Sequence, residues 1–185
     1  MVYGVPQGSI LGPVLFNLYV VDMSTMLKNT CLQYADDTNL YGHCKPQKLL
    51  HCATDMEHDL ENLSKWSEDN NLSFNCNKTK TMLFATNHVI RRFNLDDGDA
   101  YQLNIQGNSL ERVIKSKILG VMFNQSLSWG DHVNNILKSC YSTLKSLSRL
   151  KKLTPFKLRK QLSEMLILSK VDYCSTVYAD LPNYF

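Results

Sequence analysis

Two adjacent aspartates, Asp36 and Asp37, are the residues whose types and spacing could do chemistry. They lie within residues 33–40, between short apolar runs at 30–32 and 40–41. Both flanks are rich in β-formers, which predicts a tight hairpin turn at the pair. Because side-chain alternation breaks at a turn, both carboxylates can face one site. Such a pair suits a hard cation such as Mg²⁺, which takes oxygen ligands and keeps waters for substrate phosphates.

Ordinary turn chemistry is the alternative for this pair, because Asp is common in turns. The whole tetrapeptide Tyr34-Ala35-Asp36-Asp37 is expected by chance in only on the order of one in a thousand chains of this length. The pattern therefore favours a functional turn, provided that the rest of the chain agrees with it.

The composition predicts a globular protein. The chain has 185 residues, of which 44% are hydrophobic and 20% are charged, enough for one ordinary domain or two small ones. This balance excludes a disordered chain. No signal peptide or membrane span is predicted, because the apolar run at 10–21 is short and interrupted, so we expect a soluble, intracellular protein.

Positive charge is concentrated in one segment, although the net charge is only +3. From His132 to Ser163 there is no Asp or Glu. The eight cations of this segment are Lys138, Lys145, Arg149, Lys151, Lys152, Lys157, Arg159 and Lys160. This asymmetry predicts a basic arm for a polyanion, with a solvated helix face as the alternative.

Two further metal patterns are weak. The six cysteines form no Cys-x-x-Cys pair and are expected to be reduced thiols. His43-Cys44 and His51-Cys52 match none of the usual zinc-finger spacings. The acidic run 96–99 does not fit an EF-hand loop, so an exposed turn is expected there.

The periodicity of the apolar residues predicts the elements that must position the aspartates. Ser9 would cap a helix from Ile10 to about Leu27, which is apolar nearly all round and is therefore expected to be buried against a sheet. An amphipathic helix is predicted over 46–70. Short strands are predicted at 72–74, 81–84, 101–105, 109–110 and 117–123. A helix is expected from Trp129, and another is expected to start at Thr154-Pro155. The fold class is α/β (α+β).

Five segments, in this order, resemble reverse transcriptases, most closely those of non-LTR (LINE-like) retrotransposons. Gly4-Val5-Pro6-Gln7-Gly8-Ser9-Ile10-Leu11-Gly12-Pro13 with Leu15–Tyr19 is similar to motif B. Tyr34-Ala35-Asp36-Asp37 is similar to motif C, and residues 75–84 are similar to motif D. Lys117–Val121, with Leu127-Ser128-Trp129 and His132, resembles the segment after the palm that includes the primer-grip strand. Tyr173-Cys174 is similar to a segment common after the thumb.

The resemblance implies a fold and its subdivision. It implies part of a right-hand polymerase palm, with an antiparallel sheet and packed helices, followed by a helical thumb. Residues 1–86 would be the C-terminal half of the palm, with motifs B, C and D. Residues 87–128 would be connecting strands that include the primer grip, and residues 129–185 would be the thumb-like region.

The resemblance also implies a chemistry and roles for single residues. The family extends a DNA primer on an RNA template with dNTPs and two Mg²⁺ (or Mn²⁺) ions. Asp36 would be a catalytic metal ligand and Asp37 a supporting one. The other implied contacts are Gln7 and Gly8 beside the nucleotide and template base, Tyr34 and Ala35 under the primer terminus, Lys78 or Lys80 near the leaving phosphates, Leu119 and Gly120 in the primer grip, and the eight cations on the nucleic-acid backbone. For Lys78 and Lys80, a solvated turn is the alternative.

The chain departs from the family pattern at its start. The family needs a third carboxylate from motif A, upstream of motif B. We therefore expect a fragment without activity in isolation, whose missing partner is the upstream part of the same polyprotein. The other candidates, Asp22, Asp55, Asp59 and Asp69, lack the strand context to face Asp36. A non-catalytic nucleic-acid-binding remnant and a poorly folding chain without a role are the alternatives, and a nuclear location is implied by the family only.

Overall fold

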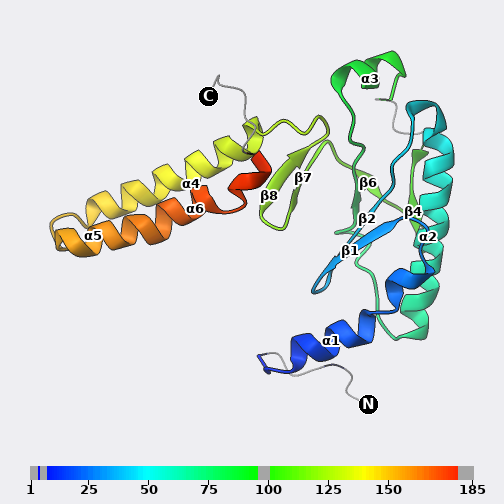
Figure 1. Cartoon of the computed structure of the whole chain (residues 1–185), viewed down its shortest axis with the longest axis horizontal. Helices are drawn as coiled ribbons and strands as arrows, with labels where there is room; N and C mark the ends of the chain where they lie inside the picture. The colour runs from blue at the N-terminus through cyan, green and yellow to red at the C-terminus, as the bar shows by residue number, and fades with distance from the viewer. Residues whose placement is uncertain (1–3, 5–7, 96–100, 179–185) are drawn as a thin grey trace. The chain divides into compact units, whose positions relative to one another are not determined.

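The computed structural model describes residues 4, 8–95 and 101–178 (Figure 1). The chain divides into two compact units, Met1–Thr81 with His88–Arg112, and Met82–Asn87 with Val113–Phe185. The elements up to residue 112 are α1 (Gly12–Val20), η1 (Met23–Met26), β1 (Thr30–Tyr34), β2 (Asp37–Tyr41), η2 (Pro46–Lys48), α2 (Leu49–Asp69), β3 (Lys80–Thr81), α3 (Asn87–Arg92), β4 (Asn104–Ile105), β5 (Asn108–Ser109) and β6 (Glu111–Arg112).

The second unit holds a hairpin followed by helices. Its elements are β7 (Lys115–Ile118), β8 (Val121–Asn124), α4 (Gly130–Arg149), α5 (Phe156–Ser163), the π-helical turn η4 (Glu164–Leu168), α6 (Ser169–Asp172) and η5 (Ser175–Tyr178). The helices predicted from Trp129 and from Thr154-Pro155 are both present. Among the described residues, no helix is long and apolar enough to cross a membrane.

The strands of the described residues form four separate two-stranded sheets. The pairs β1–β2, β4–β5 and β7–β8 are antiparallel, whereas β3–β6 is parallel. The α+β class is therefore confirmed, but the single antiparallel sheet expected from the resemblance is not what these residues form. Their strands are only two to five residues long, and each is paired on one edge only.

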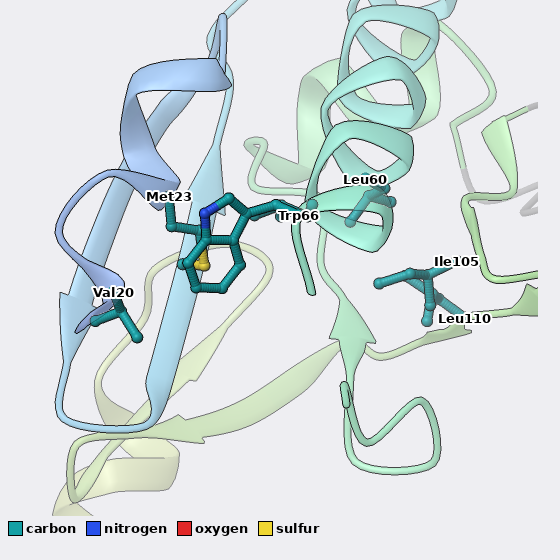
Figure 2. Close-up of a cluster of buried hydrophobic side chains, with 7 residues drawn as sticks. Val20, Met23, Leu60, Trp66, Ile105 and Leu110 are labelled. Atoms are coloured by element: carbon teal, nitrogen blue, oxygen red, sulfur yellow. The ribbon is translucent and has the colours of Figure 1, made fainter. Parts of the chain in front are cut away.

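The core of the first unit is built on the apolar stripe of α2 (Figure 2). Leu60, Leu63 and Trp66 are buried at helical spacing, and they cluster with four further buried side chains, Val20, Met23, Ile105 and Leu110. The indole N–H of Trp66 donates to Asp22 Oδ1 at 3.2 Å, so the polar edge of the ring is paired. Burial of each of these side chains contributes roughly 1.5–3 kcal/mol. The predicted amphipathic helix over 46–70 is confirmed as η2 with α2.

The expected buried helix over 10–27 is wrong in extent and in burial. The helix α1 begins at Gly12, whose N–H donates to Ser9 Oγ at 3.0 Å, and ends at Val20. Only its two terminal residues are buried, while its apolar residues Val14, Leu15 and Leu18, and Leu11 just before it, are more than half exposed. In the first unit no sheet among the described residues covers this face, so apolarity alone did not decide burial.

The strand predicted at 72–74 is also wrong, because these residues follow a helix cap. Asn71 adopts φ 52°, and the N–H of Leu72 donates back to Ser67 O at 2.8 Å. This left-handed cap satisfies the end of α2 and takes the backbone donor that a strand would need. The strand predicted at 81–84 is reduced to β3, and α3 was not expected. The acidic run 96–99 lies outside the described residues.

Candidate functional site

The predicted hairpin around the aspartates is confirmed. β1 and β2 pair in the register Thr30↔Tyr41 to Tyr34↔Asp37, which leaves Ala35 and Asp36 as the turn. Ala35 has φ 52°, a conformation that costs a residue with a Cβ about 1 kcal/mol. Positive φ at the first turn residue suits the right-handed twist of the strands that it joins. The positive φ of Ala35 therefore allows the tight turn between β1 and β2, at the cost of backbone strain at this residue.

Asp36 lies in the turn and Asp37 is the first residue of β2. Both side chains are exposed, and within the described residues neither carboxylate forms a hydrogen bond or an ion pair. Two free carboxylates are the hard oxygen donors that Mg²⁺ or Mn²⁺ prefers. The described residues hold no group of three His, Cys, Asp or Glu side chains that could bind a metal ion. The donor type therefore fits a divalent cation, and its remaining ligands would be water, substrate phosphate or groups outside the described residues.

Asp59 of α2 fastens the base of this hairpin. Its side chain is fully buried and accepts hydrogen bonds from Lys28 N (2.9 Å), Asn29 N (2.8 Å) and Asn29 Nδ2 (2.9 Å). Burial acts to raise the pKa of Asp59, but the hydrogen bonds from Lys28 and Asn29 outweigh burial, so this pKa is lowered. The chain entering β1 is thereby bound to α2.

The second strand of the hairpin is also held at the base, by close packing. A Cβ at Gly42, directly after β2, would lie 2.7 Å from Asn29 Oδ1 and 3.0 Å from Cys52 Sγ. Only glycine permits this approach, so both strands of the hairpin are held at its base, close to α2. Sequence reasoning missed this role of Asp59. The available signal was an Asp at helical spacing from Met56 and Leu63, on the apolar face of the predicted helix.

The other aspartates near this region also have partners. Asp22 accepts the indole N–H of Trp66. Asp55 lies 3.4 Å from Lys28 Nζ and 3.0 Å from His51 Nδ1, in exposed ion pairs. Asp69 is the exposed last residue of α2. These contacts account for Asp22, Asp55 and Asp59 as structural residues.

The remaining predicted residues of the first unit differ in their surroundings. Gln7 lies outside the described residues, whereas Gly8 is exposed with φ 81°. Tyr34 is 66% exposed beside the turn. Lys80 forms an ion pair with Glu111, its partner in the β3–β6 register. Lys78 lies in a turn closed by Asn75, and its ammonium has no partner among the described residues.

In the second unit, the strand predicted over 117–123 is broken by a turn. Leu119 and Gly120 join β7 to β8 and adopt φ 45° and 88°. The hydroxyl of Tyr173 donates to Leu119 O at 2.7 Å. A Cβ at Gly120 would lie 3.1 Å from Tyr173 Cε1. The turn predicted as the primer grip is therefore bound to the residue that follows α6.

The eight cations predicted to contact nucleic acid lie on α4, on α5 and on the loop between them. Seven are exposed, and Arg159 is half-buried with its guanidinium 5.9 Å from the centre of the Phe156 ring. Only Lys160 lies within 4.0 Å of a carboxylate of the described residues, at 3.9 Å from Glu164 Oε1. The basic segment is thus a helical surface whose charge is almost unneutralised.

His132 joins the start of α4 to β8. It is buried, and its Nδ1 accepts the N–H of Met122 at 3.2 Å. Burial lowers the pKa of His132, and the nearby charge of Lys117 lowers it further. The ring is therefore neutral, with its proton on Nε2, which has no hydrogen-bond partner among the described residues. Its ring also packs on Tyr178, with centroids 5.1 Å apart.

Comparison with known proteins gives one family. A family model described as "Reverse transcriptase (RNA-dependent DNA polymerase)" matches residues 2–123. The RNA-directed DNA polymerase from mobile element jockey of Drosophila melanogaster is 26% identical over an alignment of 155 positions, which covers 80% of this chain and 16% of that protein. The jockey polymerase of Drosophila funebris is 28% identical over an alignment of 144 positions, which covers 74% of this chain and 14% of that protein.

A further relative aligns with nearly the whole chain. The retrovirus-related Pol polyprotein from type-1 retrotransposable element R1 2 of Nasonia vitripennis is 24% identical over an alignment of 188 positions, which covers 98% of this chain and 44% of that protein. The chain thus spans less than half the length of each of these relatives. No solved structure gives a significant match.

Proposed function

Because the chain belongs to the reverse transcriptase (RNA-dependent DNA polymerase) family, we propose that it is part of the polymerase of a non-LTR retrotransposon and acts on an RNA template, a DNA primer and dNTPs. The predicted resemblance to this family is confirmed by the matches. The observation that carries the proposal is the β1–β2 hairpin, which has Asp36 in its turn and Asp37 at the start of β2, inside the matched residues.

In this proposal the aspartates hold the divalent cations of nucleotidyl transfer. Bound Mg²⁺ or Mn²⁺ would activate the primer 3′-hydroxyl and stabilise charge at the α-phosphate. Asp36 is the principal ligand and Asp37 the supporting one. Both carboxylates are exposed and have no partner among the described residues, so no ion pair within this part of the chain has to break before a cation binds. Tyr34 and Ala35 border the primer terminus, and Lys78 approaches the leaving phosphates, since Lys80 is paired with Glu111.

The basic helices bind the nucleic-acid backbone in the same proposal. The cations of α4, α5 and their connecting loop attract phosphates, and release of counterions makes such binding weaken steeply with salt. The subdivision into palm (1–86), connecting strands (87–128) and thumb (129–185) remains part of the proposal. A nuclear site of action follows from the same function.

We further propose that the 185 residues alone extend no primer. Two carboxylates lie at the tip of the hairpin, whereas the described residues hold no group of three metal-binding side chains. The third carboxylate would come from another part of the same polyprotein. Without it, cation binding and in-line positioning, which carry most of phosphoryl-transfer catalysis, are weakened.

Primer extension with the purified chain tests this function. The assay contains an RNA template, a DNA primer, dNTPs and Mg²⁺ or Mn²⁺, with Asp36→Asn as the control. We expect salt-sensitive binding of the primer–template without extension. Extension that Asp36→Asn abolishes would show that a third ligand comes from within the chain or from a second copy. An affinity for the primer–template that does not change with salt concentration would contradict the proposed binding by the cations of α4, α5 and their connecting loop.

Cation binding separates the proposed function from a remnant that only binds nucleic acid. Mn²⁺ titrated into the chain should bind, and binding should be lost in Asp36→Asn and retained in Asp69→Asn, a matched exposed aspartate at the end of α2. Equal Mn²⁺ binding by the wild type and Asp36→Asn would contradict the proposed metal site and would favour a protein that only binds nucleic acid.

A further inference from the structure

Two hairpin turns of this chain share an unusual backbone. Gln106 and Gly107 join β4 to β5 with φ 50° and 73°, and Leu119 and Gly120 join β7 to β8 with φ 45° and 88°. Positive φ at both residues matches the twist of the strands, and glycine adopts it freely at the second position. The first position is costly for a residue with a side chain, and most costly for a bulky apolar one. Leu119 is therefore strained, and it is 44% exposed.

A strained residue persists where its surroundings hold it in place. At Leu119 the holding group is Tyr173, which lies 54 residues away in the sequence. Its hydroxyl binds Leu119 O at 2.7 Å, and its ring lies against Gly120, 3.1 Å from the position of a Cβ. At Gly107, in contrast, a Cβ would meet nothing within 4 Å. One turn is open, and the other is gripped at both of its residues by a single side chain.

We propose that Tyr173 is a positioning residue that holds the Leu119-Gly120 turn, which the resemblance to reverse transcriptases implies is the primer grip at the 3′ end of a nucleic-acid strand. This role rests on the function proposed above. Leu119 has no charge, so it adds nothing to attraction for the backbone, which the cations of α4 and α5 supply. Its exposed apolar side chain can instead pack on the base or sugar left uncovered where a strand ends. Rigid positioning of the turn then matters for recognition of the end and not for overall affinity.

The variant Tyr173→Phe tests this role, because it removes the hydroxyl and keeps the ring. Two affinities are measured at one salt concentration, for a primer–template with a recessed 3′ end and for an uninterrupted duplex of equal length. We expect the preference for the recessed end to fall about five-fold, the size of one lost hydrogen bond. The affinity for uninterrupted duplex and its dependence on salt should not change. Tyr41→Phe is the matched control, since Tyr41 is half exposed and its hydroxyl has no partner among the described residues.

Leu119→Asn provides a second readout that does not depend on Tyr173. Asn tolerates the left-handed conformation, so the turn should form while the apolar contact is lost. The preference for the recessed end should fall as in Tyr173→Phe, again with unchanged binding of uninterrupted duplex. A merely structural role of Tyr173 would lower the unfolding midpoint and both affinities together.

The failures of the two proposals can be told apart. A wild-type chain that binds no primer–template in a salt-sensitive way would overturn both. Salt-sensitive binding with no preference for the recessed end, or with a preference that Tyr173→Phe leaves intact, would overturn the role of Tyr173 and leave the basic interface standing.

Discussion

The two hairpins that carry the proposed contacts are fastened at opposite ends. The β1–β2 hairpin is held at its base, where Asp59 binds Lys28 and Asn29, and its tip carries two carboxylates that have no partner among the residues that the structure describes. The β7–β8 hairpin is held at its tip, where Tyr173 binds Leu119 and packs on Gly120. The tip of the β1–β2 hairpin therefore has carboxylate oxygens available to bind a cation and its substrate. The tip of the β7–β8 hairpin is fixed by Tyr173 and can only offer a contact surface of constant shape. Under the proposed function, the first hairpin turn would bind a cation and the second would position nucleic acid.

The strongest test of the base-held hairpin is Asp59→Ala. The substitution leaves two backbone N–H groups and the Asn29 amide without their acceptor, so we expect a loss of about 3 to 4 kcal/mol in the free energy of unfolding. Denaturant unfolding followed by Trp66 fluorescence, in a Trp129→Phe background, reports on the first unit. Asp55→Ala is the matched control on the same helix, and its exposed ion pairs are expected to contribute less than about 1 kcal/mol. Equal losses in the two variants would mean that the hairpin base is not held by Asp59.

The tip-held hairpin is tested by two glycines of similar backbone. Gly120→Ala introduces a Cβ against the Tyr173 ring at positive φ, and we expect a loss of about 2 to 3 kcal/mol from strain and contact together. Gly107→Ala introduces only the backbone strain of a Cβ at positive φ and should lower the free energy of unfolding by about 1 kcal/mol. The difference between the denaturation free energies isolates the contact with Tyr173. If the two variants lose the same stability, the Tyr173 ring does not constrain the turn.

Acid should weaken the second unit through His132. The pKa of His132 is lowered in the fold, so the unfolded chain binds the proton more readily than the folded chain does. The stabilisation is complete above the unfolded pKa of about 6.5 and is lost as pH falls from there through the folded pKa. Unfolding midpoints between pH 7.5 and 5.5 measure this, in wild type, His132→Asn and the exposed control His43→Asn. His132→Asn should remove most of the slope over this range, because the Asn amide can accept from Met122 N–H at every pH. A slope that survives in His132→Asn and disappears in His43→Asn would contradict the assignment.

The sequence predicted what short-range patterns determine. Alternating β-formers around Asp36-Asp37 predicted the hairpin, and the stripe through Leu60 and Trp66 predicted α2. The sequence did not predict which apolar faces are buried. Burial of α1 depends on elements elsewhere in the chain, and the periodicity of its own residues does not show whether such elements cover it. Leu72 was taken for a strand residue because its capping role depends on Asn71 adopting positive φ.

In the candidate site, too, local sequence patterns predict some residues and not others. The aspartates were found from one tetrapeptide, since their chemistry is local. Asp59 and Tyr173 act on residues about 30 and 54 positions away, and no pattern of spacing within a single element connects such pairs. Tyr173 was noted in the sequence for its resemblance to a segment after the thumb, but its contact with Leu119 emerges only when α6 meets the β7–β8 hairpin.

The smallest expected effect concerns the free tip itself. Ala35 adopts φ 52° with no described contact that fixes it, so Ala35→Gly should relieve strain and stabilise the first unit by about 0.5 kcal/mol after the entropy cost of glycine. Ala53→Gly, in the interior of α2, is the control and should destabilise by about 1 kcal/mol. Both are measured by denaturant unfolding with Trp66 fluorescence in the Trp129→Phe background. The gained freedom at position 35 should at the same time weaken Mn²⁺ binding by Asp36 and Asp37, because the turn is less preorganised. If Ala35→Gly stabilises the hairpin and weakens Mn²⁺ binding, the strain at Ala35 preorganises the turn for the cation. If Ala35→Gly instead destabilises the first unit as much as Ala53→Gly does, the tip is held by contacts, as the Leu119 turn is.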